Sequence, residues 1–261
     1  MNLIRLQIHP QHLASFKAVA PVLSLLTGGV IAAWVYFSVA SPQRVGHYLT
    51  LHQVLETLSI AVSALVFAVG WKAHSLNPQR NVLILACGFL GVAILDFSHM
   101  LSFAGMPDYI TPNSVAKGIN FWLPARYLGA LTLLAAVTLH WRVPGDAAAP
   151  GPGRFVVLML VLTAVAAIHA VVFWFPQWYP QTYDDQGLTR FKIASEYGVV
   201  ALYAASLGVL LHWARERAAF DVARLFAAVW VMALSEFFFT FYITVSYTHL
   251  RAHETGRNLV C

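Results

Sequence analysis

Residues 154–176 read RFVVLMLVLTAVAAIHAVVFWFP, a run in which His169 is the only ionisable side chain after Arg154. About 20 consecutive apolar residues suffice to cross the hydrocarbon core of a bilayer as an α-helix. The segment is therefore predicted to be a transmembrane helix. Whether it stands alone decides the class of the whole protein.

Similar runs recur along the chain and are separated by proline, glycine and aspartate clusters. They fall near 17–39, 50–71, 82–103, 119–141, 191–213 and 220–244. Only 10% of the 261 residues are charged and 59% are hydrophobic, whereas a soluble domain carries about 25% charged residues. This composition excludes a soluble enzyme, and the many aromatic residues exclude disorder. The predicted fold is all-α, a polytopic transmembrane helical bundle with seven spans in contact with the lipid bilayer.

Three segments are predicted along the chain: a cytoplasmic N-terminal segment at 1–16, an integral-membrane domain at 17–244 and a tail at 245–261. The tail, which begins VSYTHLRAHET, resembles a translated sequencing adapter, so it is predicted to be non-native. An eighth span is expected to have been lost by truncation at this point.

The distribution of lysine and arginine predicts the orientation, because cytoplasmic loops are enriched in both. With the N-terminus inside, nine lie in cytoplasmic segments and four in outer ones, which favours a cytoplasmic N-terminus. The nine are Arg5, Lys17, Lys72, Arg80, Arg142, Arg154, Arg215, Arg217 and Arg224; the four are Arg44, Lys117, Arg190 and Lys192. These residues form no basic patch, so no nucleic-acid partner is expected.

Ionisable side chains inside the spans each cost about 2.5–3.5 kcal/mol on insertion scales. In the predicted topology they collect in one leaflet, roughly 4–12 Å below the outer edge at about 1.5 Å per residue. A polar cavity open to the outer face, serving as a ligand-sensing pocket, explains this clustering. Its candidate residues are His52, Glu56, Asp96, His99, Arg126, His169, Glu196 and Glu236.

Spacing separates four of these residues from the rest. His52 and Glu56 are i,i+4, and Asp96 and His99 are i,i+3, so each pair lies on one helix face. Two helices that each offer an imidazole and a carboxylate could hold iron, zinc or copper. Three interpretations stay open: a structural cluster in which Asp96 or Glu56 pairs with Arg126, a pocket for a small molecule or proton, and a metal site. The cofactor is therefore unknown, with a metal ion at this cluster as one possibility.

The segment that follows the third span, residues 101–113, contains Gly105, Pro107 and Pro112. These residues restrict the backbone, so the segment is predicted to be a structured turn. We expect it to lie as a lid over Asp96 and His99.

Four motifs resemble the MASE3 membrane-associated sensor domain family. They are LHQVLETLSI at 51–60, FAVGW at 67–71, LDFSHMLSFAGM at 95–106 and FWLPARYL at 121–128. The likeness extends over roughly 15–244. It implies a sensory module of bacterial signalling proteins, which precedes a cytoplasmic output domain in the same chain, commonly a diguanylate cyclase or a histidine kinase. A homodimer is one expected assembly.

The sequence contains no catalytic motif, and the fragment itself is predicted not to be an enzyme. A transporter or proton-conducting protein is the main alternative to a sensor, since it also needs intramembrane carboxylates and histidines. It would need polar groups that continue to the inner side, where these spans have almost none. An intramembrane enzyme or haem protein is a further possibility.

Overall fold

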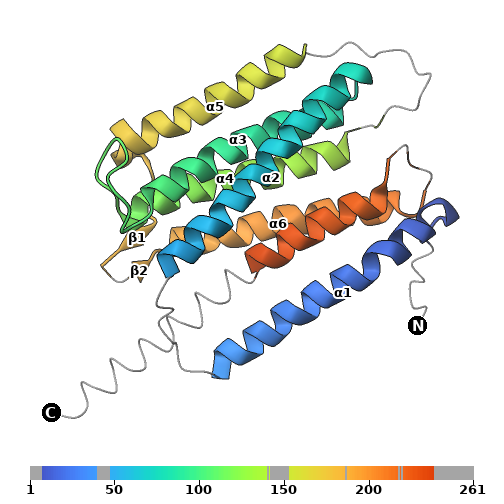
Figure 1. Cartoon of the computed structure of the whole chain (residues 1–261), viewed down its shortest axis with the longest axis horizontal. Coiled ribbons are helices and arrows are strands. Elements are labelled where there is room, and N and C mark those ends of the chain that lie inside the picture. Colours follow the sequence, from blue (N-terminus) through green and yellow to red (C-terminus); the bar gives the residue numbers. More distant parts are fainter. Residues whose placement is uncertain are drawn as a thin grey trace. The chain divides into compact units, whose positions relative to one another are not determined.

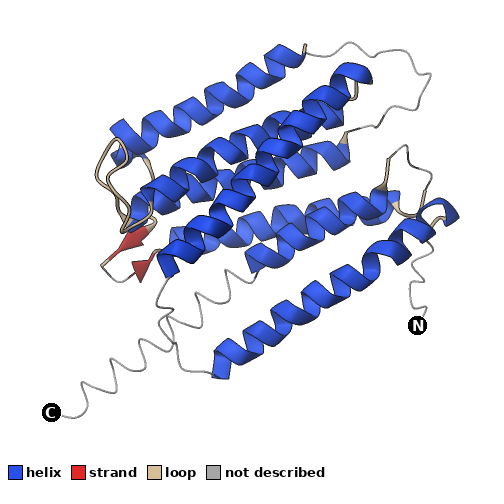
Figure 2. Cartoon of the chain, in the orientation of Figure 1, coloured by secondary structure: helices blue, strands red, loops and turns tan. Residues whose placement is uncertain are grey.

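The computed structural model describes residues 8–39, 48–139, 141, 153–185, 187–216, 218 and 220–237. Almost all of them are helical (Figures 1 and 2). The long helices are α1 (Pro10–Val39), α2 (Tyr48–Leu76), α3 (Arg80–Ser102), α4 (Val115–Thr138), α5 (Arg154–Trp174) and α6 (Arg190–Trp213). A short helix η1 (Pro176–Trp178) and the antiparallel strands β1 (Tyr183–Asp184) and β2 (Gly187–Leu188) lie between α5 and α6.

Six helices of the described residues are long and apolar enough to cross a membrane, one fewer than the seven predicted spans. The seventh predicted span, 220–244, is helical over 222–237, and its remaining residues lie outside the described part of the chain. The prediction of an all-α membrane helical bundle is confirmed. The predicted tail at 245–261 also lies outside the described residues.

The chain forms two compact units, one comprising Met1–Gly46 with Leu210–Cys261 and the other His47–Val209. In the first unit, α1 packs along the helix at 222–237. The Phe16 and Phe226 rings lie 5.7 Å apart, and the Trp230 indole donates a hydrogen bond to Thr27. The backbone amide of His9, just before α1, donates to the carbonyl of Ala214, just after α6. This bond joins the two segments in the first unit.

Helix α3 is the centre of the second unit and contacts α2, α4 and α5 (Figure 1). In its most apolar window 61% of the residues are buried, compared with 6% in α2. Small residues bring the backbones together, as is typical of membrane helices. A Cβ atom on Gly88 would lie 2.1 Å from Thr132 Oγ1 of α4, and one on Gly70 would lie 2.9 Å from Ala86 Cβ.

An aromatic and aliphatic core lies where α3, α4 and α5 meet. Its buried members are Leu95, Phe121, Ala125, Val165, Val172 and Phe173. Phe121 and Phe173 pack with ring centroids 5.2 Å apart. This core fixes the ends of the three helices near which the predicted site residues lie.

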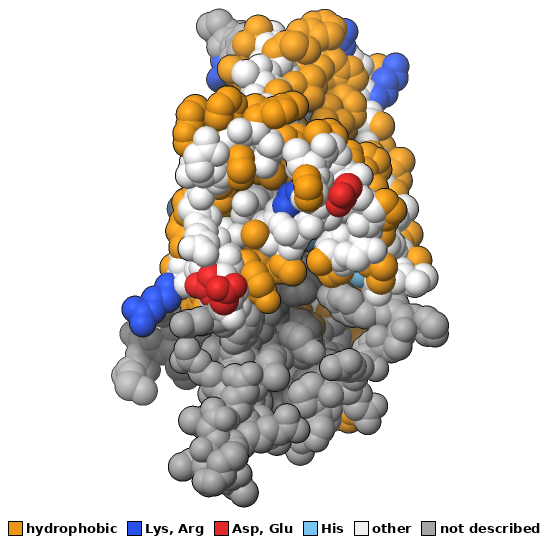
Figure 3. Space-filling view, turned by 90° about the vertical axis from the view of Figure 1, so that its left-hand side faces the viewer, with side chains coloured by type: hydrophobic (Ala, Val, Ile, Leu, Met, Phe, Trp, Pro, Cys, Tyr) orange, Lys and Arg blue, Asp and Glu red, His pale blue; other side chains and the backbone are white. Residues whose placement is uncertain are grey.

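The connections α3–α4 and α5–α6 close the same end of this unit (Figure 1). Figure 3 views the molecule from that side, where backbone and uncharged polar atoms mix with apolar side chains and few charges. Trp174, Trp178 and Tyr183 are exposed there. Aromatic residues of this kind are enriched where a membrane meets water, so this end has the composition of a membrane interface.

The close approach at Gly88 gives a prediction about stability. Gly88→Ala places a Cβ atom against the Thr132 side chain, and overpacking of this kind costs about 1–3 kcal/mol. Gly208→Ala is the matched control, because no atom lies within 4 Å of its added Cβ, and helix propensity alone favours alanine by up to about 1 kcal/mol. Unfolding in mixed detergent micelles should show a lower free energy of unfolding for Gly88→Ala only. Equal stabilities of the two variants would contradict the close α3–α4 contact.

Candidate functional site

The second unit contains seven of the eight predicted site residues, near the end closed by the two connections. At about 1.5 Å per residue, they lie between about 4 Å and about 16 Å from the nearest helix end. His99 is the shallowest, three residues before Ser102. Arg126 is deeper than its predicted 4–12 Å, because α4 begins at Val115 rather than at 119.

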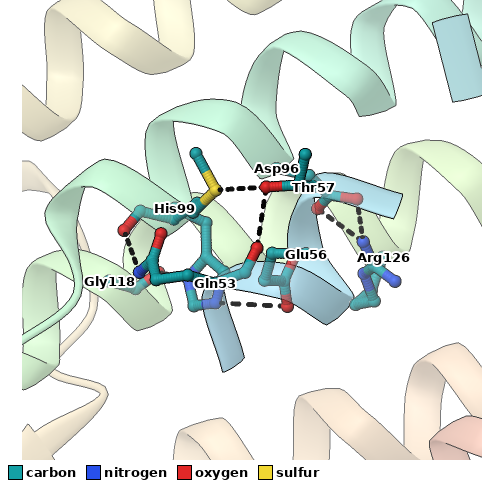
Figure 4. Close-up of polar contacts among 8 residues, drawn as sticks. Gln53, Glu56, Thr57, Asp96, His99, Gly118 and Arg126 are labelled. Atoms are coloured by element: carbon teal, nitrogen blue, oxygen red, sulfur yellow. Dashed lines mark hydrogen bonds and ion pairs between the residues drawn. The ribbon is translucent and has the colours of Figure 1, made fainter. Parts of the chain in front are cut away.

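Asp96 and Arg126 form an ion pair that joins α3 to α4 (Figure 4). The Arg126 Nη2 atom lies 2.5 Å from both carboxylate oxygens of Asp96. The Asp96 side chain is completely buried, and that of Arg126 is 15% exposed. Of the partners considered for Arg126, the structure therefore places Asp96, and not Glu56, in direct contact with the guanidinium.

Glu56 instead groups with two histidines. One ligand atom each from His52, Glu56 and His99 lies within 4.8 Å of the others. The His99 Nε2 atom is 3.9 Å from Glu56 Oε1, and the His52 and His99 rings meet edge-on with centroids 5.6 Å apart. The i,i+4 spacing on α2 thus brings both of its residues to the His99 side of α3. We call these three residues the His–Glu–His cluster.

The hydrogen bond of His99 fixes its tautomer. Its Nδ1 atom lies 2.8 Å from the carbonyl oxygen of Gly118 on α4. A carbonyl oxygen only accepts, so Nδ1 carries the proton and donates. In the neutral ring, Nε2 then has a lone pair directed towards the cluster. One backbone carbonyl of α4 thereby orients the only α3 member of the cluster.

Further contacts tie α2 to α3 beside the cluster (Figure 4). The Gln53 amide donates to the Met100 carbonyl at 3.3 Å, and the Thr57 hydroxyl lies 3.6 Å from the Met100 sulfur. On the side of the connecting loop, the Phe103 ring packs on His52 with centroids 4.2 Å apart. The cluster therefore lies in a defined α2–α3 interface, and it keeps some access, since the Glu56 side chain is 20% exposed.

A second buried ion pair lies on α6, between Lys192 and Glu196. The Lys192 Nζ atom is 2.5 Å from Glu196 Oε1, and both side chains are less than 5% exposed. The Trp122 ring of α4 lies beside both cations, 5.2 Å from Lys192 Nζ and 5.9 Å from the Arg126 guanidinium carbon. Cation–π contacts of this kind link the two ion pairs through one aromatic side chain.

Other contacts hold α4 against α6 at the same level. The Tyr127 hydroxyl donates to the Ser195 carbonyl at 3.0 Å, and a Cβ atom on Gly198 would lie 2.5 Å from that hydroxyl. Nearby, burial and the neighbouring Tyr127 raise the pKa of Tyr179 to about 12. Tyr179 is therefore neutral at physiological pH.

Two predicted site residues lie outside these groups. His169 uses both ring nitrogens, because Nδ1 bonds the Val165 carbonyl at 2.8 Å and Nε2 accepts from the Ser98 hydroxyl at 2.7 Å. It is a satisfied core histidine beside Phe121. Glu236 is buried in the other compact unit. The eight predicted residues thus divide into separate groups.

The connection between α3 and α4 is a structured turn, as predicted. The Asn113 side-chain amide donates to three carbonyls, those of Leu101, Met106 and Pro107. The Lys117 ammonium, also buried, donates to the carbonyls of Tyr109 and Thr111 and to the Asn113 side chain. Lys117 is adjacent to Gly118, so the residue that holds the loop neighbours the carbonyl that orients His99.

Sequence reasoning missed Lys117, Trp122 and Lys192 as parts of this arrangement. The two lysines had been assigned to outer segments, but both are buried within the first turns of their helices. A signal for Lys192 was available, since its i,i+4 spacing from Glu196 is that of a helical ion pair. Lys117 carries no such signal, because its partners are backbone carbonyls of a folded loop.

The comparisons with known proteins give one match. The family model of MASE3, described as a membrane-associated sensor domain, matches residues 43–253. The match begins after α1 and extends into the predicted tail, whereas the likeness seen in the motifs covered roughly 15–244. No curated protein and no solved structure matches the chain.

The buried pair at Asp96 gives a prediction about stability. Asp96→Asn removes the carboxylate that faces the buried Arg126 guanidinium, and breaking a buried ion pair costs about 3–5 kcal/mol. The double variant Asp96→Leu/Arg126→Met removes both charges and should recover much of this loss. The control is Asp221→Asn, which weakens the partly exposed Asp221–Arg224 pair by less than about 1 kcal/mol and keeps a good helix cap. Unfolding in micelles measures all three, and an unchanged stability of Asp96→Asn would contradict the buried pair.

The anchoring role of Lys117 is also testable. Lys117→Met removes three charge-assisted hydrogen bonds to the 103–113 loop, each worth about 1.5–3 kcal/mol. Amide hydrogen exchange over 103–113 should therefore become about tenfold faster or more. Lys72→Met, on an exposed position of α2, is the control and should leave the loop unchanged. Equal exchange in the two variants would show that Lys117 does not hold the loop.

Proposed function

Because the chain belongs to the MASE3 family of membrane-associated sensor domains, we propose that it detects a small ligand, an ion or a proton at the His–Glu–His cluster. In this proposal it reports the stimulus to a cytoplasmic output domain, a diguanylate cyclase or a histidine kinase, joined to the same polypeptide. The N-terminus lies in the cytoplasm, the membrane is the bacterial inner membrane, and the closed end of the second unit faces outward. No residue of the chain acts catalytically.

One arrangement carries the proposal: the cluster lies at the start of a series of neighbouring polar groups that ends on α6. Glu56 lies within electrostatic reach of Asp96 and Arg126. The Arg126 guanidinium lies beside Trp122, which lies beside Lys192. The series therefore passes from α2 and α3 through α4 to the ion pair on α6.

In this proposal the stimulus acts by changing the electrostatic charge at Glu56. A proton, a cation or an anionic ligand at Glu56 changes the net charge beside Arg126, and in a low-dielectric membrane interior such a change is weakly screened. To signal, the stimulus must bind two arrangements of the helices with unequal affinity. We propose that these arrangements differ in how tightly α4 holds α6 through Trp122 and Lys192.

Helix α6 is suited to carry the change across the membrane. It has 24 residues without interruption, which corresponds to about 36 Å at 1.5 Å per residue. Its first turns contain Lys192 and Glu196, and its last turn ends at Trp213. A tilt or shift imposed at one end is therefore transmitted to the other end of the helix as a rigid element.

The distribution of ionisable residues favours this proposal over transport. Between residues 57 and 71 of α2, 81 and 95 of α3, and 127 and 138 of α4, the sequence contains no acidic, basic or histidine residue. A proton or ion path needs polar groups over the whole membrane depth. The buried ionisable residues described in the second unit instead lie towards one end.

The test joins this chain in a continuous reading frame to a diguanylate cyclase domain and measures cyclic-di-GMP in cells during pH steps and additions of divalent metal. Glu56→Gln is expected to reduce the response about fivefold or more, since allosteric couplings are typically worth 1–3 kcal/mol. The matched control is Glu216→Gln, an exposed glutamate i,i+4 from a histidine, which should respond as the wild type does.

Membrane abundance of each variant is measured in parallel, so that loss of protein is not taken for loss of signalling. A full response that persists after both Asp96 and His99 are made apolar would overturn the proposed function.

A further inference from the structure

The His–Glu–His cluster has the composition and the spacing of a metal site. It offers two imidazole nitrogens and one carboxylate oxygen, a set that suits zinc, copper(II) and iron(II). The three ligand atoms lie within 4.8 Å of one another, and they come from two helices that pack together. Three protein ligands leave one position open for water or another small ligand.

We propose that His52, Glu56 and His99 bind one divalent transition-metal ion between α2 and α3. This inference rests on the proposed function, because it names the chemical class of the stimulus at the same site. It also differs from the four-residue set expected from the sequence. Asp96 is not among the three residues whose ligand atoms lie close together, and both its oxygens accept hydrogen bonds from Arg126, so we place it in the pair beside the ion.

The orientation of His99 supports metal binding. Metal-ligating histidines characteristically donate their other ring nitrogen to a carbonyl or a carboxylate, as His99 does to Gly118 at 2.8 Å. This bond leaves Nε2 as the ligand atom on the side of Glu56. The ring is also fixed in direction, which lowers the cost of ordering it when the ion binds.

The distance between His99 Nε2 and Glu56 Oε1 fits two ligands of one ion better than a direct hydrogen bond. At 3.9 Å it exceeds the 2.7–3.2 Å range of N–H···O bonds. Metal–ligand bonds of about 2.0–2.2 Å place neighbouring ligand atoms of a tetrahedral site roughly 3.4 Å apart. A small rotamer change in Glu56 closes the difference.

Binding would add a further link between two helices that already pack together. Most of the apolar part of α2 is not buried, and its polar contacts with α3 beside the cluster include those of Gln53 and Thr57 to Met100. Two ligands from α2 and one from α3 would add a strong bridge at this end. The ion would also add positive charge within electrostatic reach of Arg126.

The experiment uses the full chain in lipid nanodiscs, freed of metal with a chelator and titrated with Co²⁺ alone. Visible absorption reports the coordination geometry, and Zn²⁺ competition gives the affinity for zinc. We expect one Co²⁺ per chain, with d–d bands of a low-coordinate nitrogen–oxygen site that Zn²⁺ abolishes. Glu56→Gln and His99→Ala should each weaken binding more than about 100-fold, since loss of an outer-shell partner alone typically costs 10–100-fold.

The matched control is His212→Ala, which removes the histidine of an exposed His–Glu pair with the same i,i+4 spacing and should bind Co²⁺ as the wild type does. Circular dichroism of each metal-free variant checks that the helices are intact. Glu56→Gln preserves the shape of the side chain, so it tests the site even if His99→Ala fails to fold.

Equal Co²⁺ affinity in the wild type and in Glu56→Gln would overturn the metal site, as would bands that persist in the triple variant of all three residues. Either result leaves the proposed sensor intact, because another stimulus could act at Glu56. If Co²⁺ binds as expected and the cyclase fusion stays unresponsive in every condition, the metal site stands and the proposed function fails.

Discussion

The buried ion pair between Asp96 and Arg126 is the constraint on which the rest of the site depends. Removing two charges from water costs several kcal/mol for each ion, and only close mutual contact repays that cost. The pair therefore requires α3 and α4 to approach closely. Because Gly88 has no side chain opposite Thr132, the two helices can approach closely about two turns further along. Because Arg126 pairs with Asp96, Glu56 groups with His52 and His99 instead.

The pair also separates two kinds of polar residue that look alike in the sequence. Asp96 is completely buried and its charge is neutralised by Arg126, so it has a structural role. Glu56 keeps partial exposure and lies 3.9 Å from a histidine, so it can exchange partners with a proton, an ion or a ligand. Trp122 lies beside both Arg126 and Lys192, so it links the ion pair to α6. The structural pair and the exchangeable cluster are adjacent, which lets a change in one affect the other.

Much of this could be predicted from periodicity and spacing. Apolar runs of sufficient length predicted the six long helices, and the i,i+4 spacing of His52 and Glu56 placed both on one face. The choice of partner for Arg126 could not be predicted, because Glu56 and Asp96 occupy similar depths and only the packing of three helices decides between them. Lys117 and Lys192 were misplaced because a basic residue at a helix end suggests solvent, whereas here carbonyls of a folded loop and Glu196 surround them. His169 is set apart from the cluster by its hydrogen bond with Ser98, and no sequence pattern marks Ser98 as its partner.

We propose that a change of charge at Glu56 alters how tightly α6 is held, through the Asp96–Arg126 pair. Amide hydrogen exchange of α6 around residues 190–200, measured in nanodiscs, tests it most directly. We predict that Glu56→Gln changes exchange there in the wild-type background, and that the change disappears in the Asp96→Leu/Arg126→Met background. Unchanged exchange in α6 after Glu56→Gln, or an equal change in both backgrounds, would rule out this coupling through the ion pair.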